Sequence, residues 1–240
     1  MPEFTPYLAA SVTYLVAALA LARLTLSRRQ ARLTAWSGAV HLPAALLAPL
    51  LEPSYWAPAR TGGVAFGLED VLITLAVAVW AWYLVALRFD ARLTAPATLR
   101  VAFQRSLVPG AGVIGGFLLA WAASVDPMTA LLAVCLLAAV ALGALRPGRW
   151  KLAAWGALSL SFVWFGLVWA TYAIAPGFAA QWNGAGAWAI RLAGVPLGEL
   201  AWAAAFGAFW PVFFAHVFDV ALAPRPVDAK SPRRARQAAR

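Results

Sequence analysis

The chain has 240 residues, of which 63% are hydrophobic and 12% are charged, and its net charge is +10 at pH 7. Soluble domains are about half apolar and about a quarter charged, so this composition excludes an ordinary soluble domain and indicates an integral membrane protein. A single cysteine, Cys135, excludes an intramolecular disulfide. The first residues, MPEFTPYLAASV, contain no basic segment, so we expect the first apolar run to remain as a helix.

Seven segments have the length and apolarity of a membrane-spanning helix, which needs about 20 residues. They lie at residues 8–26, 35–52, 68–88, 106–124, 127–145, 152–175 and 197–221. The sequence therefore predicts an all-α integral membrane protein with seven transmembrane helices.

The basic residues are distributed unevenly between the predicted loops. All of the 19 Lys and Arg residues except Arg60 and Arg191 fall near the first, third and fifth connections or after the last helix. Because basic loops stay in the cytoplasm, this pattern predicts the N-terminus outside and the C-terminus inside. It also accounts for the positive charge without a nucleic-acid partner. We expect the cell (plasma) membrane as the location.

The sequence also repeats itself. The third helix begins with GLED and the seventh with PLGE, and the acids Asp70 and Glu199 each precede a second acid by 20 residues, Asp90 and Asp219. We therefore expect two parallel three-helix repeats joined by a linking helix, which would bring both acidic motifs to the outer face. The predicted units are residues 1–95 (first repeat), 96–125 (linking helix), 126–222 (second repeat) and 223–240 (basic disordered cytoplasmic tail).

Three acids at helix starts are the strongest candidates for chemistry: Glu69, Asp70 and Glu199. A carboxylate in a first helical turn also serves as a cap for free backbone N–H groups, so capping is the alternative. Ionisable groups in spanning segments usually face a partner or a cavity. Arg60 and Arg191, one in each outer loop, are the cations that would pair with these acids.

The remaining ionisable residues have simpler interpretations. Asp90 and Asp219 are expected in ion pairs at the cytoplasmic interface. His41 and His216 are expected to be hydrogen-bonded packing residues, because isolated histidines do not form a metal signature. Glu52 is either interfacial or part of the outer acidic cluster.

Several functional classes are excluded by what the sequence lacks. No phosphate-binding loop or dinucleotide fingerprint is present, and we expect no cofactor and no metal. A retinal protein needs a lysine in its last helix, whereas Lys151 and Lys230 both lie outside the predicted spans. A charge-coupled transporter would carry ionisable residues near the membrane midplane, but here they gather at one interface.

The segments PGFAAQWN and GVPLGELAWAAAFGAFWPVFFAHVFD resemble the signature of the lycopene cyclase domain family, and SYWAPARTGGVAFGLEDVLITL resembles its first copy. The resemblance covers most of residues 1–221. It implies closure of the acyclic end of lycopene or a related carotenoid into an ionone ring by a proton-initiated, redox-neutral isomerisation. Carried over to this sequence, the resemblance gives Glu69, Asp70 and Glu199 as catalytic residues and Trp56, Trp182, Trp202 and Asn183 as substrate-binding residues.

Two positions depart from the family pattern. Gly67 replaces the motif proline of the first copy, and Gly198 stands where the second copy has its first acid. The alternative function is therefore a non-catalytic carotenoid- or isoprenoid-binding membrane protein, or a partner subunit in carotenoid biosynthesis. The expected partners are a polyene substrate, the lipid bilayer and other carotenoid enzymes.

Overall fold

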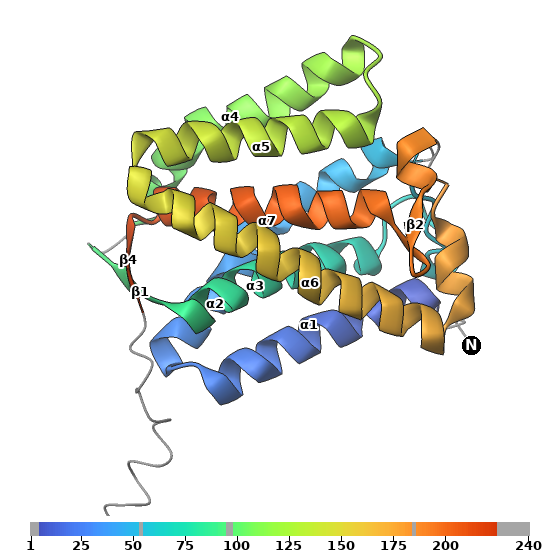
Figure 1. The fold of residues 1–240 in the computed structure, drawn as a ribbon, viewed down its shortest axis with the longest axis horizontal. Coiled ribbons are helices and arrows are strands. Elements are labelled where there is room, and N and C mark those ends of the chain that lie inside the picture. The colour runs from blue at the N-terminus through green and yellow to red at the C-terminus, as the bar shows by residue number, and fades with distance from the viewer. Residues whose placement is uncertain (1–4, 53–54, 95–97, 184–185, 225–240) are drawn as a thin grey trace, which may run out of the picture.

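The computed structural model describes residues 5–52, 55–94, 98–183 and 186–224, which form a bundle of α-helices (Figure 1). Within these residues, six helices are long and apolar enough to cross a membrane. They are α1 (Pro6–Thr25), α3 (Leu68–Arg88), α4 (Leu99–Ala122), α5 (Pro127–Leu145), α6 (Trp150–Ile174) and α7 (Leu197–Val217). The all-α prediction is confirmed, and the chain has the character of a multi-pass membrane protein.

The segment predicted as the second spanning helix, 35–52, is built differently. Helix α2 (Arg28–His41) is followed by the 3-10 helix η1 (Leu42–Leu51). Pro43 and Pro49 lack the backbone N–H that an α-helix needs, so the α-helical ladder does not continue through this segment. This segment is therefore not among the six long helices, and a seventh crossing stays a prediction.

Most helices start at a polar side chain that accepts a hydrogen bond from a free backbone N–H group. Thr5, Ser27, Thr98 and Asp126 cap α1, α2, α4 and α5 in this way. Helix α3 starts differently, because the Asp70 carboxylate accepts from the backbone N–H of Gly67 at 2.8 Å. Asp70 therefore caps the start of α3, as the capping alternative predicted.

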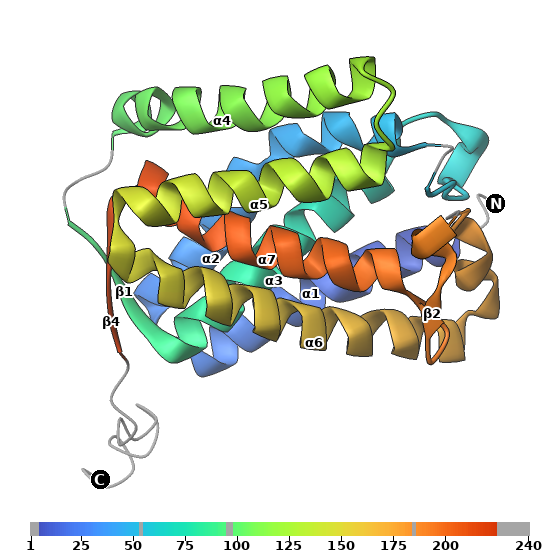
Figure 2. The ribbon, with the colours of Figure 1, turned by 45° about the horizontal axis from the view of Figure 1, so that its top comes forward.

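Helices α3 and α7 form the buried centre of the bundle. Helices α1 and α2 pack on α3, and α5 and α6 pack on α7. Helix α6 lies very close to α7, because the backbones of Gly156 and Gly207 touch. Helix α4 is the outermost element and packs on α5 and α7 (Figures 1 and 2).

The segments that adjoin α3 and α7 pair with each other at both ends of the bundle. At one end, here called the loop end, the backbones of Trp56 and Trp182 form an antiparallel bridge. At the other, here called the strand end, β1 (Phe89–Leu93) pairs antiparallel with β4 (Val220–Pro224). Both central helices begin at the loop end and end at the strand end (Figure 1).

The strand pairing corrects the predicted end of the last helix. Helix α7 stops at Val217 rather than at residue 221, because Asp219 turns the chain with a positive φ of 49° and Val220 enters β4. The five residues of β1, FDARL, show no alternation of buried and exposed side chains, and this strand was not predicted from the sequence. Most of the predicted basic tail, residues 225–240, lies outside the described residues.

The remaining described elements are short. At the loop end they are the 3-10 turns η2 (Thr61–Gly63), η4 (Pro176–Gln181) and η5 (Gly186–Ala189) and the hairpin of β2 (Arg191–Leu192) with β3 (Val195–Pro196). The turn η3 (Pro147–Arg149) precedes α6 at the strand end.

Candidate functional site

Glu199 lies in the first turn of α7 and is buried there by three neutral hydrogen-bond donors. Its Oε1 accepts from the Tyr55 hydroxyl at 3.0 Å and from Trp182 Nε1 at 2.9 Å. Its Oε2 accepts from Trp164 Nε1 at 2.9 Å. No Lys, Arg or His of the described residues forms an ion pair with this carboxyl.

Tyr55 occupies the space beside Gly198. A Cβ added at Gly198 would lie 2.5 Å from the Tyr55 hydroxyl and 2.7 Å from its nearest ring carbon. Burial and the neighbouring Glu199 raise the pKa of Tyr55, so its hydroxyl keeps its proton and acts as a donor. The phenol therefore fills the place where a longer side chain at position 198 would have to go.

The other predicted acids form a separate cluster around Arg60. The Arg60 guanidinium donates to Asp70 Oδ2 at 2.6 Å and Oδ1 at 3.0 Å, and it also binds both oxygens of Glu52. Burial opposes the charge, but hydrogen bonds with Glu52 and Asp70 raise the pKa of Arg60. Tyr7 donates to Asp70 at 3.1 Å. Of the two interpretations of Glu52, interfacial residue or member of the acidic cluster, this ion-pair network supports the second.

Glu69 is fully buried beside this network, and its Oε1 accepts from the backbone N–H of Thr61 at 2.7 Å. A Cβ at Gly67 would meet the Glu69 Oε2 atom. Proline at this position would also lack the backbone N–H that Gly67 donates to Asp70.

A large apolar cavity meets Glu199 and does not meet the Arg60 network. Its volume is about 950 Å³, and it extends along α7 from Glu199 to Phe218, a helical distance of about 28 Å at 1.5 Å per residue. Its other walls come from α2 with η1, α3, α4, α5 and α6. Among the described residues that line it, Glu199 is the one carboxylate. The cavity suits a long apolar molecule that presents one end to this acid.

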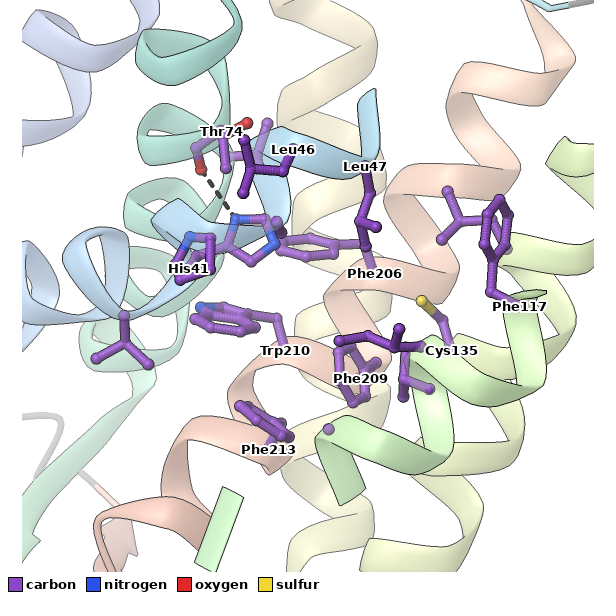
Figure 3. Close-up of a pocket in the computed structure, with 18 of the residues that line it drawn as sticks. His41, Leu46, Leu47, Thr74, Phe117, Cys135, Phe206, Phe209, Trp210 and Phe213 are labelled. Carbon is purple, nitrogen blue, oxygen red and sulfur yellow. Dashed lines mark hydrogen bonds between the residues drawn. The ribbon is translucent and has the colours of Figure 1, made fainter. Parts of the chain in front are cut away.

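Aromatic rings at helical spacing form one wall of the cavity (Figure 3). Trp202 stacks on Phe206 and Phe206 on Trp210, with ring centroids 5.4 and 5.8 Å apart and ring planes within 13° and 7°. Trp164 contacts Trp202 at 5.2 Å, close to the acid. The rings thus continue from the carboxyl end into the middle of the cavity.

The structure brings some of the predicted substrate-binding residues together. Trp56, Trp182 and Trp202 all line the cavity. Asn183 is exposed and is not among the lining residues; its backbone N–H donates to the Tyr55 carbonyl at 2.9 Å. Trp56 also contacts Tyr7, with ring centroids 4.8 Å apart, and so connects the cavity wall with the Arg60 network.

Two contacts of Glu199 were not predicted from the sequence. Tyr55 comes from the loop before α3 and Trp164 from the middle of α6, so neither is near Glu199 along the chain. The sequence feature that could have pointed to Tyr55 is that it directly precedes Trp56, which belongs to the repeated loop motif. No sequence pattern distinguished Trp164 from the other tryptophans in spanning segments.

Asp90 and Asp219 form the ion pairs expected at the strand end. Asp90 binds Arg29 and Arg92, and Asp219 binds Arg146 at 2.7 Å. Partial burial acts against the ionised form, but hydrogen bonds from Arg92 and Gln30 lower the pKa of Asp90. The Thr94 hydroxyl and Arg146 lower the pKa of Asp219.

The predicted second cation, Arg191, does not pair with an acid among the described residues. Its guanidinium donates to the backbone carbonyls of Gly194 at 3.2 Å and Ala179 at 3.4 Å, and the side chain is exposed. The two arginines therefore differ in role, since Arg60 binds buried acids and Arg191 binds backbone carbonyls.

Comparisons of this chain with family models, with curated proteins and with solved structures find no match. The lycopene cyclase resemblance therefore rests on the quoted motifs.

Proposed function

We propose that the protein is a membrane carotenoid cyclase that closes the acyclic end of lycopene or a related carotenoid into an ionone ring. The observation that carries the proposal is the position of Glu199, a carboxyl group held by neutral donors at one end of a long apolar cavity. A proton-initiated cyclisation needs an acid at the end of a water-poor slot, because water would quench the carbocation.

In this mechanism Glu199 acts in both proton steps. Its protonated form gives a proton to the terminal double bond, and the neighbouring double bond attacks the resulting cation to close the ring. Loss of a proton from the new ring then returns the proton to the Glu199 carboxylate, so the reaction is redox-neutral and the enzyme is regenerated. Tyr55, Trp164 and Trp182 donate hydrogen bonds that stabilise the carboxylate between the two steps.

The aromatic wall supports the same chemistry. A cation near a tryptophan face is stabilised by about 0.5–2 kcal/mol, depending on desolvation. Trp164 and Trp202 contact each other beside Glu199, so the cation would form next to two indole rings. The stacked rings beyond them provide an apolar surface for the rest of the polyene.

The proposed membrane arrangement has seven crossings, with α2 and η1 together as the second crossing. The N-terminus and the loop end lie outside and the C-terminus inside, in the cell membrane. Helices α1–α3 and α5–α7 are two parallel repeats, and α4 links them. Two observations support this arrangement: the basic residues Arg29, Arg92, Arg105 and Arg146 gather at the strand end, and the segments next to α3 and α7 pair with each other at both ends.

A second candidate is a carotenoid- or isoprenoid-binding protein without catalysis, acting alone or as a partner subunit in carotenoid biosynthesis. It is favoured by the separation of the acids. Asp70 is engaged by Arg60 outside the cavity wall, and Gly198 gives no second carboxyl beside Glu199. In this case the cavity would hold an unaltered polyene.

Expression in a lycopene-producing host, with analysis of the extracted pigments, separates the two candidates. Glu199→Gln should abolish the cyclised product without preventing membrane insertion, because the amide cannot donate a carboxyl proton. Glu69→Gln tests the other predicted acid: because Glu69 lies outside the cavity wall, this variant should keep the product if Glu199 acts alone and lose it if Glu69 is also catalytic. Inserted, folded wild-type protein that binds lycopene but forms no cyclised product would favour the binding protein. Product from Glu199→Gln at the wild-type rate would exclude Glu199 as the acid.

A further inference from the structure

His41 places a polar group half-way along the apolar cavity. It is the last residue of α2 and lines the cavity wall. Its imidazole contacts Trp210 and Phe206, with ring centroids 4.5 and 4.9 Å apart (Figure 3). Along α7, Phe206 lies about 10 Å and Trp210 about 16 Å from Glu199, at 1.5 Å per residue. The imidazole is therefore remote from the acid, and it cannot take part in a ring closure there.

One hydrogen bond fixes the proton of this imidazole. His41 Nδ1 lies 3.0 Å from the carbonyl oxygen of Thr74 (Figure 3). A carbonyl oxygen only accepts, so Nδ1 carries the hydrogen and donates it. In the neutral ring the other nitrogen, Nε2, is then an acceptor with a free lone pair.

Nε2 has no donor within the part of the chain that the structure describes. Two other polar groups in or behind this wall are paired elsewhere: Trp210 Nε1 donates to Ser37 at 2.7 Å, and Ser106 donates to the Phe103 carbonyl at 2.8 Å. His41 is only partly buried and lines the cavity, and Nε2 is not among the fully enclosed unpaired polar atoms. An unpaired acceptor in apolar surroundings is unfavourable.

We propose that His41 Nε2 accepts a hydrogen bond from the molecule in the cavity, and that this molecule is a long isoprenoid polyene carrying a hydroxyl group. The inference rests on the proposed function in one respect, that the cavity holds a polyene. It narrows the substrate class from a pure hydrocarbon to a hydroxylated chain. The hydroxyl lies level with Phe206 and Trp210 while the reacting end meets Glu199.

A matched ligand pair tests this directly. Retinol and retinyl methyl ether have the same polyene chain, but only the alcohol has an O–H donor. The full chain is purified in lipid nanodiscs, and binding is followed by quenching of the cavity tryptophans. We expect the dissociation constant of the ether to be about fivefold higher than that of the alcohol, since one hydrogen bond contributes about 1 kcal/mol and a tenfold change corresponds to about 1.4 kcal/mol.

Two variants assign that preference to His41. His41→Phe keeps a flat ring in contact with Phe206 and Trp210 but has no acceptor, so alcohol and ether should bind equally. His41→Gln has both a donor for the Thr74 carbonyl and an acceptor for the ligand, so it should restore part of the preference. Circular dichroism of each variant checks that the helices are intact.

The outcomes separate this inference from the proposed function. Equal binding of alcohol and ether to the wild type, failure of both to bind, or a preference that persists in His41→Phe, would overturn the role of His41. A water molecule bound at Nε2 in place of a ligand hydroxyl gives the first of these results. Lycopene binding is measured in the same nanodiscs. If lycopene binds but the alcohol preference is missing, only the His41 inference fails; if lycopene does not bind either, the proposed function fails with it.

Discussion

A single added methyl group at Gly198 should destabilise the protein through Tyr55. The new Cβ would lie 2.5 Å from the Tyr55 hydroxyl and 2.7 and 2.8 Å from two of its ring carbons, well inside the optimal contact distance of about 3.5–4.0 Å. The phenol must move, and its 3.0 Å hydrogen bond to Glu199 is then lost. The carboxyl keeps only the two indole donors.

The expected loss in the free energy of unfolding is about 2–4 kcal/mol. Overpacking a well-filled site typically costs about 1–3 kcal/mol, and a buried polar group left without its hydrogen bond costs about 1–3 kcal/mol. The two effects arise from one movement of Tyr55, so they overlap rather than add in full. Gly166→Ala in α6 is the matched control, because a Cβ there meets open space and alanine is favoured in a helix by about 0.5–1 kcal/mol.

The assay is reversible unfolding of the detergent-solubilised protein followed by tryptophan fluorescence. Each glycine variant is compared in the wild-type and Tyr55→Ala backgrounds. With alanine at position 55, Gly198→Ala should have little further effect, which gives a coupling energy close to its full destabilisation in the wild type. An equal loss in both backgrounds, or a Gly198→Ala protein as stable as Gly166→Ala, would refute the argument that Tyr55 occupies this space.

Three further predictions concern other parts of the fold. Arg60→Leu should destabilise the protein by about 3–5 kcal/mol, because Asp70 would remain buried without its cation. Gly156→Ala should destabilise it by about 1–3 kcal/mol, since the added Cβ would collide with the backbone of α7. Wild-type stability should fall as the pH drops through and below about 4, because a carboxyl whose pKa is lowered in the folded state loses its stabilising effect on protonation. Asp219→Asn should flatten that part of the pH profile.

Each of these predictions has a matched control in the same unfolding assay. Arg191→Leu removes an exposed arginine that binds only carbonyls, so it should change stability by less than about 0.5 kcal/mol. If Arg60→Leu changed the free energy of unfolding equally little, the ion-pair network would have no structural role. Gly166→Ala again serves as the control for Gly156→Ala, and equal stabilities would mean that α6 and α7 are not in backbone contact. If the Asp219→Asn protein lost as much stability at low pH as the wild type, the acid sensitivity would come from other carboxylates and not from Asp219.

Composition and hydrophobic length predicted the ends of α1, α3, α5 and α6 to within two residues, whereas α4 begins at Leu99 rather than at 106. The starts and ends of α3 and α5 agree with the predicted segments, because each is a continuous apolar run bounded by polar or turn residues. The second segment is different because Pro43 and Pro49 interrupt it. The segment remains strongly apolar with these prolines included, so a length-and-composition criterion could not detect the change to a 3-10 helix.

The sequence by itself also determined that acids open α3 and α7, and the common 20-residue spacing to Asp90 and Asp219 pointed to one end of the molecule. It could not determine that the acids have different surroundings. Only the tertiary structure decided that Arg60 and Glu52 engage Asp70 while Tyr55, Trp164 and Trp182 surround Glu199. The reason is that each carboxylate is satisfied by residues from distant segments, and which donors reach it depends on how closely the helices pack.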